Sequence, residues 1–182
     1  MSLFLDALAW IFSPDRLTDN PSLPLLVVQH LFYTFVSVVI AALIAVPLGY
    51  LIGHTGRGRE IAVGISGAAR ALPSFGLILL LVLVIGVTQK PLAAFIAFVL
   101  LAIPSVLAGA YSGLEQIDRR VIDAARAVGM TEWQILLRVE IPLGLPLLIG
   151  GLRAATLQVV ATVTVAAYIG LVIVQGTGVS PF

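Results

Sequence analysis

Residues 113–142 read GLEQIDRRVIDAARAVGMTEWQILLRVEIP, and this stretch decides how the rest of the chain is organised. Of the ten basic and nine acidic residues in the chain, nine lie here: Glu115, Asp118, Arg119, Arg120, Asp123, Arg126, Glu132, Arg138 and Glu140. The sequence on both sides runs for long distances almost without charge. This pattern predicts a polar loop outside the membrane, between membrane-embedded segments. We call residues 114–141 the charged loop.

The whole chain has the composition of a membrane protein. Of its 182 residues, 60% are hydrophobic and only 10% are charged, and the mean hydropathy is +1.12. A soluble domain carries about 25% charged residues, so burial in an ordinary core does not explain this composition. The net charge of +1 gives no sign of a nucleic-acid-binding surface. The chain has no cysteine, which excludes disulfides and thiolate metal sites. We predict an all-α protein of the cell membrane.

Uncharged runs in the chain are long enough for membrane-spanning helices, which need roughly 20 apolar residues. We predict one transmembrane domain over 24–182, with spans near 24–53, 71–89, 91–113 and 142–165 and a partial span at 166–182. Segment 1–23 lacks the basic start and small-residue cleavage site of a signal peptide. We predict that it lies at the outer membrane interface, with Trp10 near the lipid headgroups.

Small residues and prolines within these runs predict close packing and kinks. Two GxxxG patterns, at 49–53 and 109–113, have the spacing that lets helix backbones approach each other in lipid, although Gly is common in all membrane helices. Pro47, Pro73 and Pro104 lie inside the apolar runs, where a proline tends to bend a helix. Such kinks fit a transporter, and they also occur in plain helix bundles.

The placement of basic residues predicts the orientation, because short loops rich in Lys and Arg stay on the cytoplasmic side. Arg57 and Arg59 follow the first predicted span, and the charged loop contains several further Arg. Segment 1–23 and the turn around Lys90 then fall on the opposite side. We therefore predict a multi-pass protein with its amino terminus outside the cell and the charged loop in the cytoplasm.

Local chemistry predicts two short helices in the charged loop. The first covers about 116–128, where apolar residues recur at helical spacing, and Gly129 ends it, since Gly readily adopts the left-handed conformation after a helix. Thr131 is a good N-cap for the second helix, and Gln134, three residues on, completes a capping box. Pro142 is expected to end this helix, because a residue before proline disfavours helical backbone. These features alone suit either a solvated amphipathic loop or a docking element.

A longer pattern in the charged loop favours the docking element. Asp123-Ala-Ala-Arg-Ala-Val-Gly129 is followed, after nine residues, by Val139-Glu-Ile-Pro142. This resembles the EAA motif of ABC importer permeases, which is Glu-Ala-Ala, three residues, Gly, nine residues, then Ile-x-Leu-Pro. Asp, Val and Ile here replace Glu, Ile and Leu, and the spacing matches throughout. Segments 29–34, 70–75 and 102–105 also resemble the osmoprotectant permeases of this class, which import glycine betaine, carnitine or choline.

The resemblance covers roughly residues 25–170 and implies a fold and a function. In that family the fold is the MetI-like helix bundle, and the motif forms a coupling helix that docks on a cytoplasmic ATPase. The chain would then be a permease subunit rather than an enzyme. Its implied partners are ABC ATPase subunits, a second permease copy or paralogue, and an extracytoplasmic substrate-binding protein. The residues expected to contact the ATPase are Asp123, Ala124, Ala125, Arg126, Gly129, Met130, Thr131 and Trp133.

The chemistry that the sequence lacks supports this division of labour. It contains no Walker A motif, so we expect a partner subunit to bind and hydrolyse the ATP, and this chain to hold no cofactor or metal and no catalytic residue.

Arg153 interrupts the last apolar run and is expected to snorkel to the cytoplasmic interface. A substrate path is expected among aromatic and polar residues of the spans: Phe75, Tyr111, Gln158 and Thr162.

Other interpretations remain open on the sequence alone. After Gly170 the chain departs from the osmoprotectant permeases, which continue through another membrane helix, so we expect a truncated carboxyl end. The permease could instead serve another small-solute ABC importer, of the amino acid or methionine type. A secondary transporter or channel fragment, or a membrane scaffold subunit, would need no ATPase. An ordered, capped docking helix in the charged loop distinguishes the importer from these.

Overall fold

The computed structural model describes residues 2–11, 13–14, 22–71 and 73–168, and the regular elements within them are helical, with no β-strand. The predicted all-α fold is confirmed. Three described helical stretches are long and apolar enough to cross a membrane, which makes this a multi-pass membrane protein. The elements in chain order are α1 (Ser2–Ile11), α3 (Leu23–Thr55), α4 (Arg59–Ala71), α5 (Ser74–Ile85), η1 (Val87–Gln89), α6 (Lys90–Glu115), α7 (Arg119–Ala127), α8 (Glu132–Ile135), η2 (Leu136–Glu140) and α9 (Ile141–Tyr168). The side chain of Trp10 and most of the predicted partial span at 166–182 lie outside the described residues.

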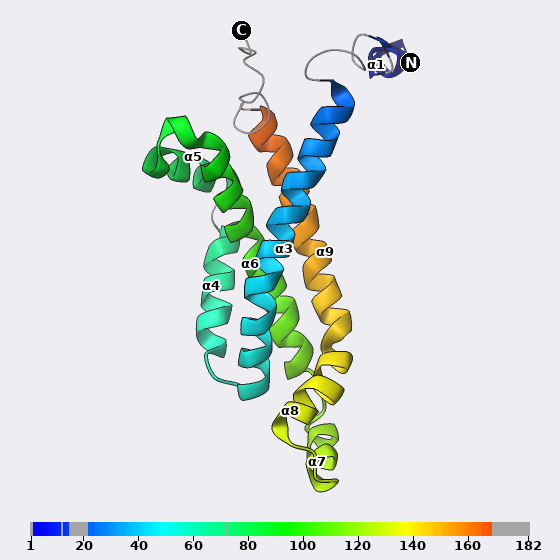
Figure 1. Cartoon of the computed structure of the whole chain (residues 1–182), viewed down its shortest axis with the longest axis vertical. Coiled ribbons are helices and arrows are strands. Elements are labelled where there is room, and N and C mark those ends of the chain that lie inside the picture. Colours follow the sequence, from blue (N-terminus) through cyan, green and yellow to red (C-terminus); the bar gives the residue numbers. More distant parts are fainter. Residues whose placement is uncertain (1, 12, 15–21, 72, 169–182) are drawn as a thin grey trace.

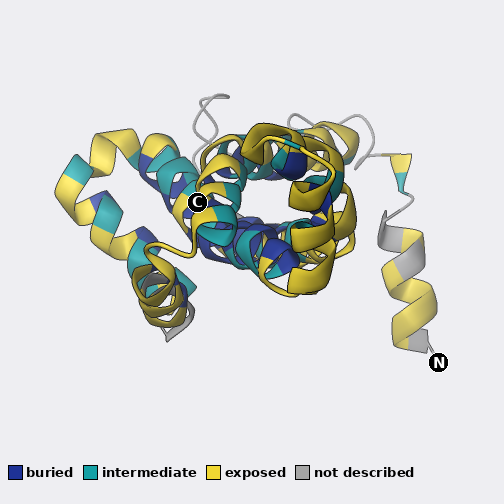
Figure 2. Ribbon diagram, turned by 90° about the horizontal axis from the view of Figure 1, so that it is seen from below, coloured by how far each residue is buried: buried dark blue, intermediate teal, exposed yellow. Residues whose placement is uncertain are grey.

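Helix α6 is the centre of the bundle. It packs against α3, α4, α5 and α9, and α3 also packs against α9 (Figure 1). In its most apolar stretch 67% of residues are buried, against 22% in α3 and 28% in α9. Viewed along the bundle, buried residues face inward and exposed ones face outward (Figure 2). Many of the exposed residues are large and apolar, such as Leu43, Leu83 and Val84, which suits contact with lipid.

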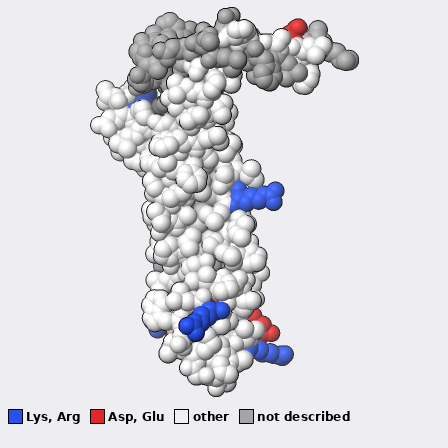
Figure 3. Space-filling view, turned by 45° about the vertical axis from the view of Figure 1, so that its right-hand side comes forward, with Lys and Arg blue, Asp and Glu red and all other residues white. Residues whose placement is uncertain are grey.

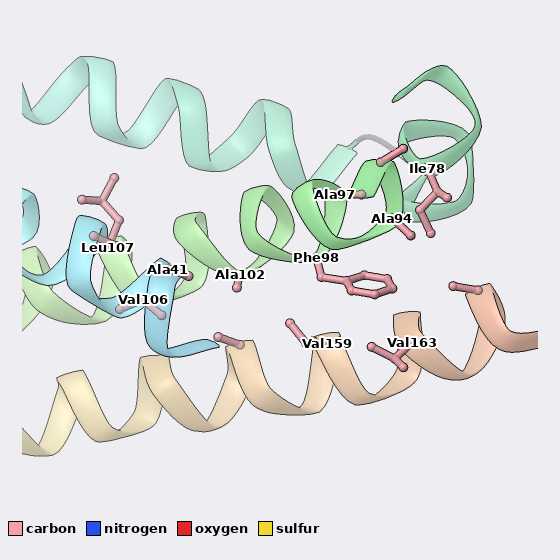
Figure 4. Close-up of a cluster of buried hydrophobic side chains, with 14 of the residues drawn as sticks. Ala41, Ile78, Ala94, Ala97, Phe98, Ala102, Val106, Leu107, Val159 and Val163 are labelled. Carbon is pink, nitrogen blue, oxygen red and sulfur yellow. The ribbon is translucent and has the colours of Figure 1, made fainter. Parts of the chain in front are cut away.

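Small residues bring the backbones of α3, α6 and α9 together, and both GxxxG patterns serve this packing. A Cβ atom added to Gly113 would lie 2.6 Å from the backbone oxygen of Gly144, and one added to Gly53 would lie 2.8 Å from the Cβ of Leu114. Further toward the other end of α6, the ring of Phe98 fills the space beside α9 (Figure 4). The core therefore combines close backbone crossings with a few large apolar side chains.

The second predicted span, 71–89, is longer than the α-helix found there, since α5 covers only Ser74–Ile85 and η1 follows it. The prediction also missed α4, which precedes α5 and packs against α6, with a break just before Ser74 (Figure 1). Pro73 accounts for the break, since its own backbone is extended, with φ −62° and ψ 121°, and it cannot donate a backbone hydrogen bond. Charged residues at the start of α4 also concealed its helical character, because Arg59 and Glu60 made the segment look like part of a loop.

Candidate functional site

The charged loop forms a hairpin of two short helices, α7 and α8, at one end of the bundle (Figure 1). Helix α7 begins at Arg119, three residues later than predicted, because the carboxylate of Asp118 accepts a hydrogen bond from the backbone N–H of Arg120 at 2.9 Å. An aspartate in this position is an N-cap, which satisfies a donor that the first turn leaves free. The start of the hairpin is therefore fixed by its own side chain.

The turn between the two helices has the predicted left-handed glycine. Gly129 has a φ of 85°, and its N–H donates to the carbonyl of Arg126 at 2.9 Å. The N–H of Met130 donates to the carbonyl of Ala125 at 3.1 Å. These two bonds make a Schellman motif, in which the chain satisfies the last free carbonyls of a helix as it turns away. The predicted role of Gly129 as helix terminator is confirmed.

The predicted capping box at the start of α8 is also confirmed. The Thr131 hydroxyl accepts from the backbone N–H of Gln134 at 3.4 Å, and the Gln134 side-chain oxygen accepts from the N–H of Thr131 at 2.9 Å. Such reciprocal bonds fix where a helix begins and the angle at which the chain enters it. Helix α8 thus leaves the turn in a direction set by local chemistry.

The prediction that Pro142 ends this second helix is wrong. The helix continues through a π-turn at Leu136–Glu140 and then as α9, and Ile141 keeps helical angles of φ −60° and ψ −50°. A proline ring clashes with the carbonyl one turn earlier in a regular α-helix. The wider π-turn directly before Pro142 changes that register, so the helix passes the proline without stopping. As a result, α8 and the membrane helix α9 are joined without a loop.

An exposed ion pair between Arg126 of α7 and Glu132 of α8 connects the two helices of the hairpin. The Arg126 guanidinium donates to both carboxylate oxygens of Glu132, at 2.9 and 3.2 Å, and lies 3.6 Å from Asp123. The hydrogen bond to Glu132 raises the pKa of Arg126 above its usual value. The hydrogen bond to Arg126 lowers the pKa of Glu132. Both side chains are about half exposed, so water weakens this attraction.

A histidine at the end of α3 contacts the same hairpin from the bundle side. Nδ1 of His54 lies 2.6 Å from a carboxylate oxygen of Glu140, and its Nε2 lies 3.6 Å from a carboxylate oxygen of Glu132. Glu140 is only 7% exposed. Sequence reasoning missed this cluster because His54 and Glu140 are 86 residues apart. The available signal was a histidine at the end of a span, on the same predicted side as an acidic loop.

The residues expected to contact an ATPase lie together on the hairpin, and most of them are exposed: Asp123, Ala124, Arg126, Gly129, Thr131 and Trp133. Ala125 is buried and Met130 is half-buried, so their side chains support the hairpin from within. Trp133 is 73% exposed and Val128 is 78% exposed. On the face shown in Figure 3, charged side chains gather mainly at this end of the molecule. The hairpin thus exposes apolar side chains as well as charged ones.

The residues expected to form a substrate path lie at different levels of the bundle. Phe75 is in the first turn of α5, near the break, while Tyr111 lies close to the opposite end of the bundle, four residues before α6 ends. Gln158 and Thr162 are in the distal half of α9, where the Thr162 hydroxyl donates to the backbone carbonyl of Gln158 at 2.8 Å. Their place in a substrate path stays a prediction.

Arg153 lies well inside α9. It is in α9, 12 residues beyond Ile141, which corresponds to about 18 Å along the helix at 1.5 Å per residue. Its side chain is exposed on the surface of the single chain. The expectation that Arg153 snorkels to the cytoplasmic interface stays a prediction.

Comparison with known proteins gives a consistent result. The family described as the binding-protein-dependent transport system inner membrane component matches residues 45–177. The osmoprotectant import permease protein OsmW of Salmonella typhimurium is 36% identical over 148 residues, which cover 78% of this chain and 67% of that protein. The carnitine transport permease protein OpuCB of Listeria monocytogenes is 30% identical over 78% of this chain. The glycine betaine/carnitine/choline transport system permease protein OpuCB of Bacillus subtilis is 28% identical over the same share. The chain spans 64% of the length of each of these last two proteins.

Proposed function

The chain belongs to the family of binding-protein-dependent transport system inner membrane components, and from this premise we propose that it is the permease subunit of an ATP-driven osmoprotectant importer. The proposed substrate is a small quaternary amine of the glycine betaine, carnitine or choline type, since similar proteins are named for these compounds. A separate subunit hydrolyses the ATP.

The charged loop is the observation that carries this proposal. Its two helices are held by a Schellman turn and a capping box, and it presents Trp133 and Val128 to solvent. Large exposed apolar side chains on an ordered helical hairpin suit contact with a partner protein. We propose that a cytoplasmic ATPase covers it. Because α8 continues into α9 without a loop, a movement of the docked hairpin would reach the membrane directly.

The exposed face of α9 supports a second permease copy or paralogue. A charge within a membrane helix usually faces a protein partner or a water-filled path rather than lipid. Arg153 lies on the exposed side of α9, and little of that helix is buried within the single chain. A second permease on this side would shield Arg153 from lipid and help to enclose a path. An extracytoplasmic binding protein would deliver the substrate to the other end.

The proposed orientation has the amino terminus outside and the charged loop in the cytoplasm. The chain has no cysteine, so single cysteines report which side they face. Arg120→Cys and Gln89→Cys form a matched pair at exposed positions, with Gln89 directly before α6 and Arg120 in α7, after its other end. An impermeant thiol reagent added to intact cells should label the cysteine at position 89 only. Labelling at position 120 under the same conditions would contradict the orientation.

The function itself is tested by co-purification and uptake. The chain is expressed with its ATPase, purified in detergent, and reconstituted into liposomes with the binding protein and labelled glycine betaine, carnitine or choline. We expect uptake that requires ATP, and we expect Trp133→Glu to prevent ATPase association while the chain still inserts. Uptake by the isolated chain without ATP would favour a secondary transporter instead.

A further inference from the structure

The end of α3 approaches the charged loop through one side chain. His54 lies in the last turn of α3, and Gly56 ends that helix with a φ of 68°. Both ring nitrogens of His54 face carboxylates of the loop, with Glu140 on one side and Glu132 on the other. A protonated imidazole can donate to both carboxylates at once. The carboxyl end of a helix also favours a positive charge at this position.

The two carboxylates flank the π-turn. Glu132 is the first residue of α8, and Glu140 is the last residue of the π-turn that joins α8 to α9. Glu140 is buried beside the bundle, although its neighbours Arg138 and Pro142 are exposed. The π-turn therefore directs this carboxylate inward, toward α3. His54 therefore contacts the first residue of α8, Glu132, and the residue directly before α9, Glu140.

Within the described residues, the side-chain hydrogen bonds and ion pairs that join α7, α8 and the π-turn to the rest of the bundle all go through His54. The nearby ion pair of Arg59 with Glu115, at 2.9 Å, joins α4 to the end of α6 and does not involve the hairpin. A cavity of about 500 Å³ separates α7 from the ends of α3 and α6, and His54 and Glu140 line one side of it. Among the described residues, polar side-chain contacts therefore hold the hairpin to α3 through His54.

We propose that His54 is a positioning residue that links the charged loop to α3, so that a displacement of the docking hairpin moves α3 together with α9. The proposal rests on the proposed function for its meaning in transport, but the link itself is a property of the single chain. Without this link, a displacement of α8 would reach α9 along the chain, and it would reach α3 only through the packing of α3 against α9. With it, α3 also has its own polar contact to the hairpin.

The first test measures the link without transport. Amide hydrogen exchange of residues 119–140 is followed in the full chain in nanodiscs. Removing one partner of a buried ion pair leaves the other charge uncompensated, so we expect exchange at least about tenfold faster in His54→Ala and in Glu140→Gln. The double variant should exchange no faster than either single one, because both remove the same contact. Arg59→Gln, which breaks the adjacent pair only, should leave exchange unchanged.

The second test measures coupling in the complex with ATPase and binding protein. We expect the number of substrate molecules taken up per ATP to fall severalfold in His54→Ala and to recover in His54→Lys, which restores a cation that can reach both carboxylates. Unchanged exchange in both single variants overturns the link. Faster exchange with an unchanged uptake per ATP also overturns it, since His54 would then only brace the fold. If the unaltered complex shows no ATP-driven uptake, the proposed function fails, and the exchange measurement still decides the link.

Discussion

The crossing of α6 with its neighbours and the charged loop are held together in opposite ways. At the crossing, Gly and Ala let backbones approach until an added methyl group would collide with a backbone atom. In the charged loop, helices are short and largely exposed, and caps, a Schellman turn and ion pairs determine their geometry. The crossing depends on glycines, whose lack of a side chain lets the backbones meet. The charged loop depends on individual hydrogen bonds and ion pairs.

This difference predicts how each region responds to change. Lipid is as apolar as the helix surfaces, so helices in a membrane gain little from burial and rely on close packing. Added volume should therefore damage the crossing most. The loop has room around it, so added volume should matter little there, while a lost cap or a strained backbone should matter more. The following substitutions separate these two responses, from the largest expected effect to the smallest.

Gly113→Ala should have the largest effect. Its methyl group would lie 2.6 Å from the backbone oxygen of Gly144, and a backbone atom in a helix crossing cannot move aside cheaply. We expect a loss of stability of about 3 kcal/mol, at the upper end for overpacking, measured by unfolding in mixed detergent micelles. Gly64→Ala is the matched control, because the space around Gly64 is open. It should gain up to about 1 kcal/mol from helix propensity, and equal losses at both positions would refute the role of close packing.

Gly129→Val tests the loop at its most constrained backbone position. No atom lies within 4 Å of the Cβ position, so any effect comes from the φ of 85° and not from crowding. A residue other than Gly in this conformation costs roughly 1–3 kcal/mol, and a β-branched residue is among the worst fitted to it. We expect normal membrane abundance but reduced ATPase association and uptake. Gly129→Asn, which tolerates the conformation, should be close to normal.

If Gly129→Val showed normal uptake, the angle between α7 and α8 would be unimportant for coupling. If it failed to reach the membrane, the loop would be part of the folding core, and the contrast between the two regions would be lost.

The contrast also explains what could be predicted from the sequence. The motif at 123–142 pointed to the family. The geometry of the hairpin followed from Gly129, Thr131 and Gln134, because each of them bonds only to residues within one or two helical turns. The limits of the first and third spans followed from uncharged runs that match α3 and α6 closely. These features depend on local patterns, which a sequence displays directly.

Other features depend on competition between effects or on distant residues. Pro142 follows a π-turn and does not stop its helix, and Pro47 and Pro104 lie inside α3 and α6, so a proline does not by itself mark the end of a helix. The contact of His54 with Glu140 requires α3 and α9 to be side by side, which no local pattern states. The two glycine patterns indicated close packing, yet only the structure shows that Gly113 meets Gly144.

Thr131→Ala should have an intermediate effect, confined to the loop. It removes the hydroxyl that accepts from the Gln134 N–H and so opens the capping box. Loss of an N-cap costs about 1 kcal/mol, which should appear as faster hydrogen exchange in α8 with no change in the unfolding of the bundle. Thr164→Ala is the control, since its exposed hydroxyl only donates back to a carbonyl of its own helix. A comparable change in both variants would mean that the cap does not hold the hairpin.

Arg126→Gln should have the smallest effect, because both members of this ion pair are about half exposed and screened by water. The hydrogen bond from Arg126 lowers the pKa of Glu132, so the carboxylate form is favoured in the folded hairpin. The resulting stabilisation is present above the pKa of Glu132 in the unfolded chain and is lost as the pH falls through its lowered value in the fold. Exchange protection of α7 and α8 should therefore decline in acid in the unaltered chain and less so in Arg126→Gln, and salt should reduce the difference between them. An acid-induced loss of equal size in both chains would place the sensitive carboxylate elsewhere, and Glu140, buried against His54, would be the next residue to test.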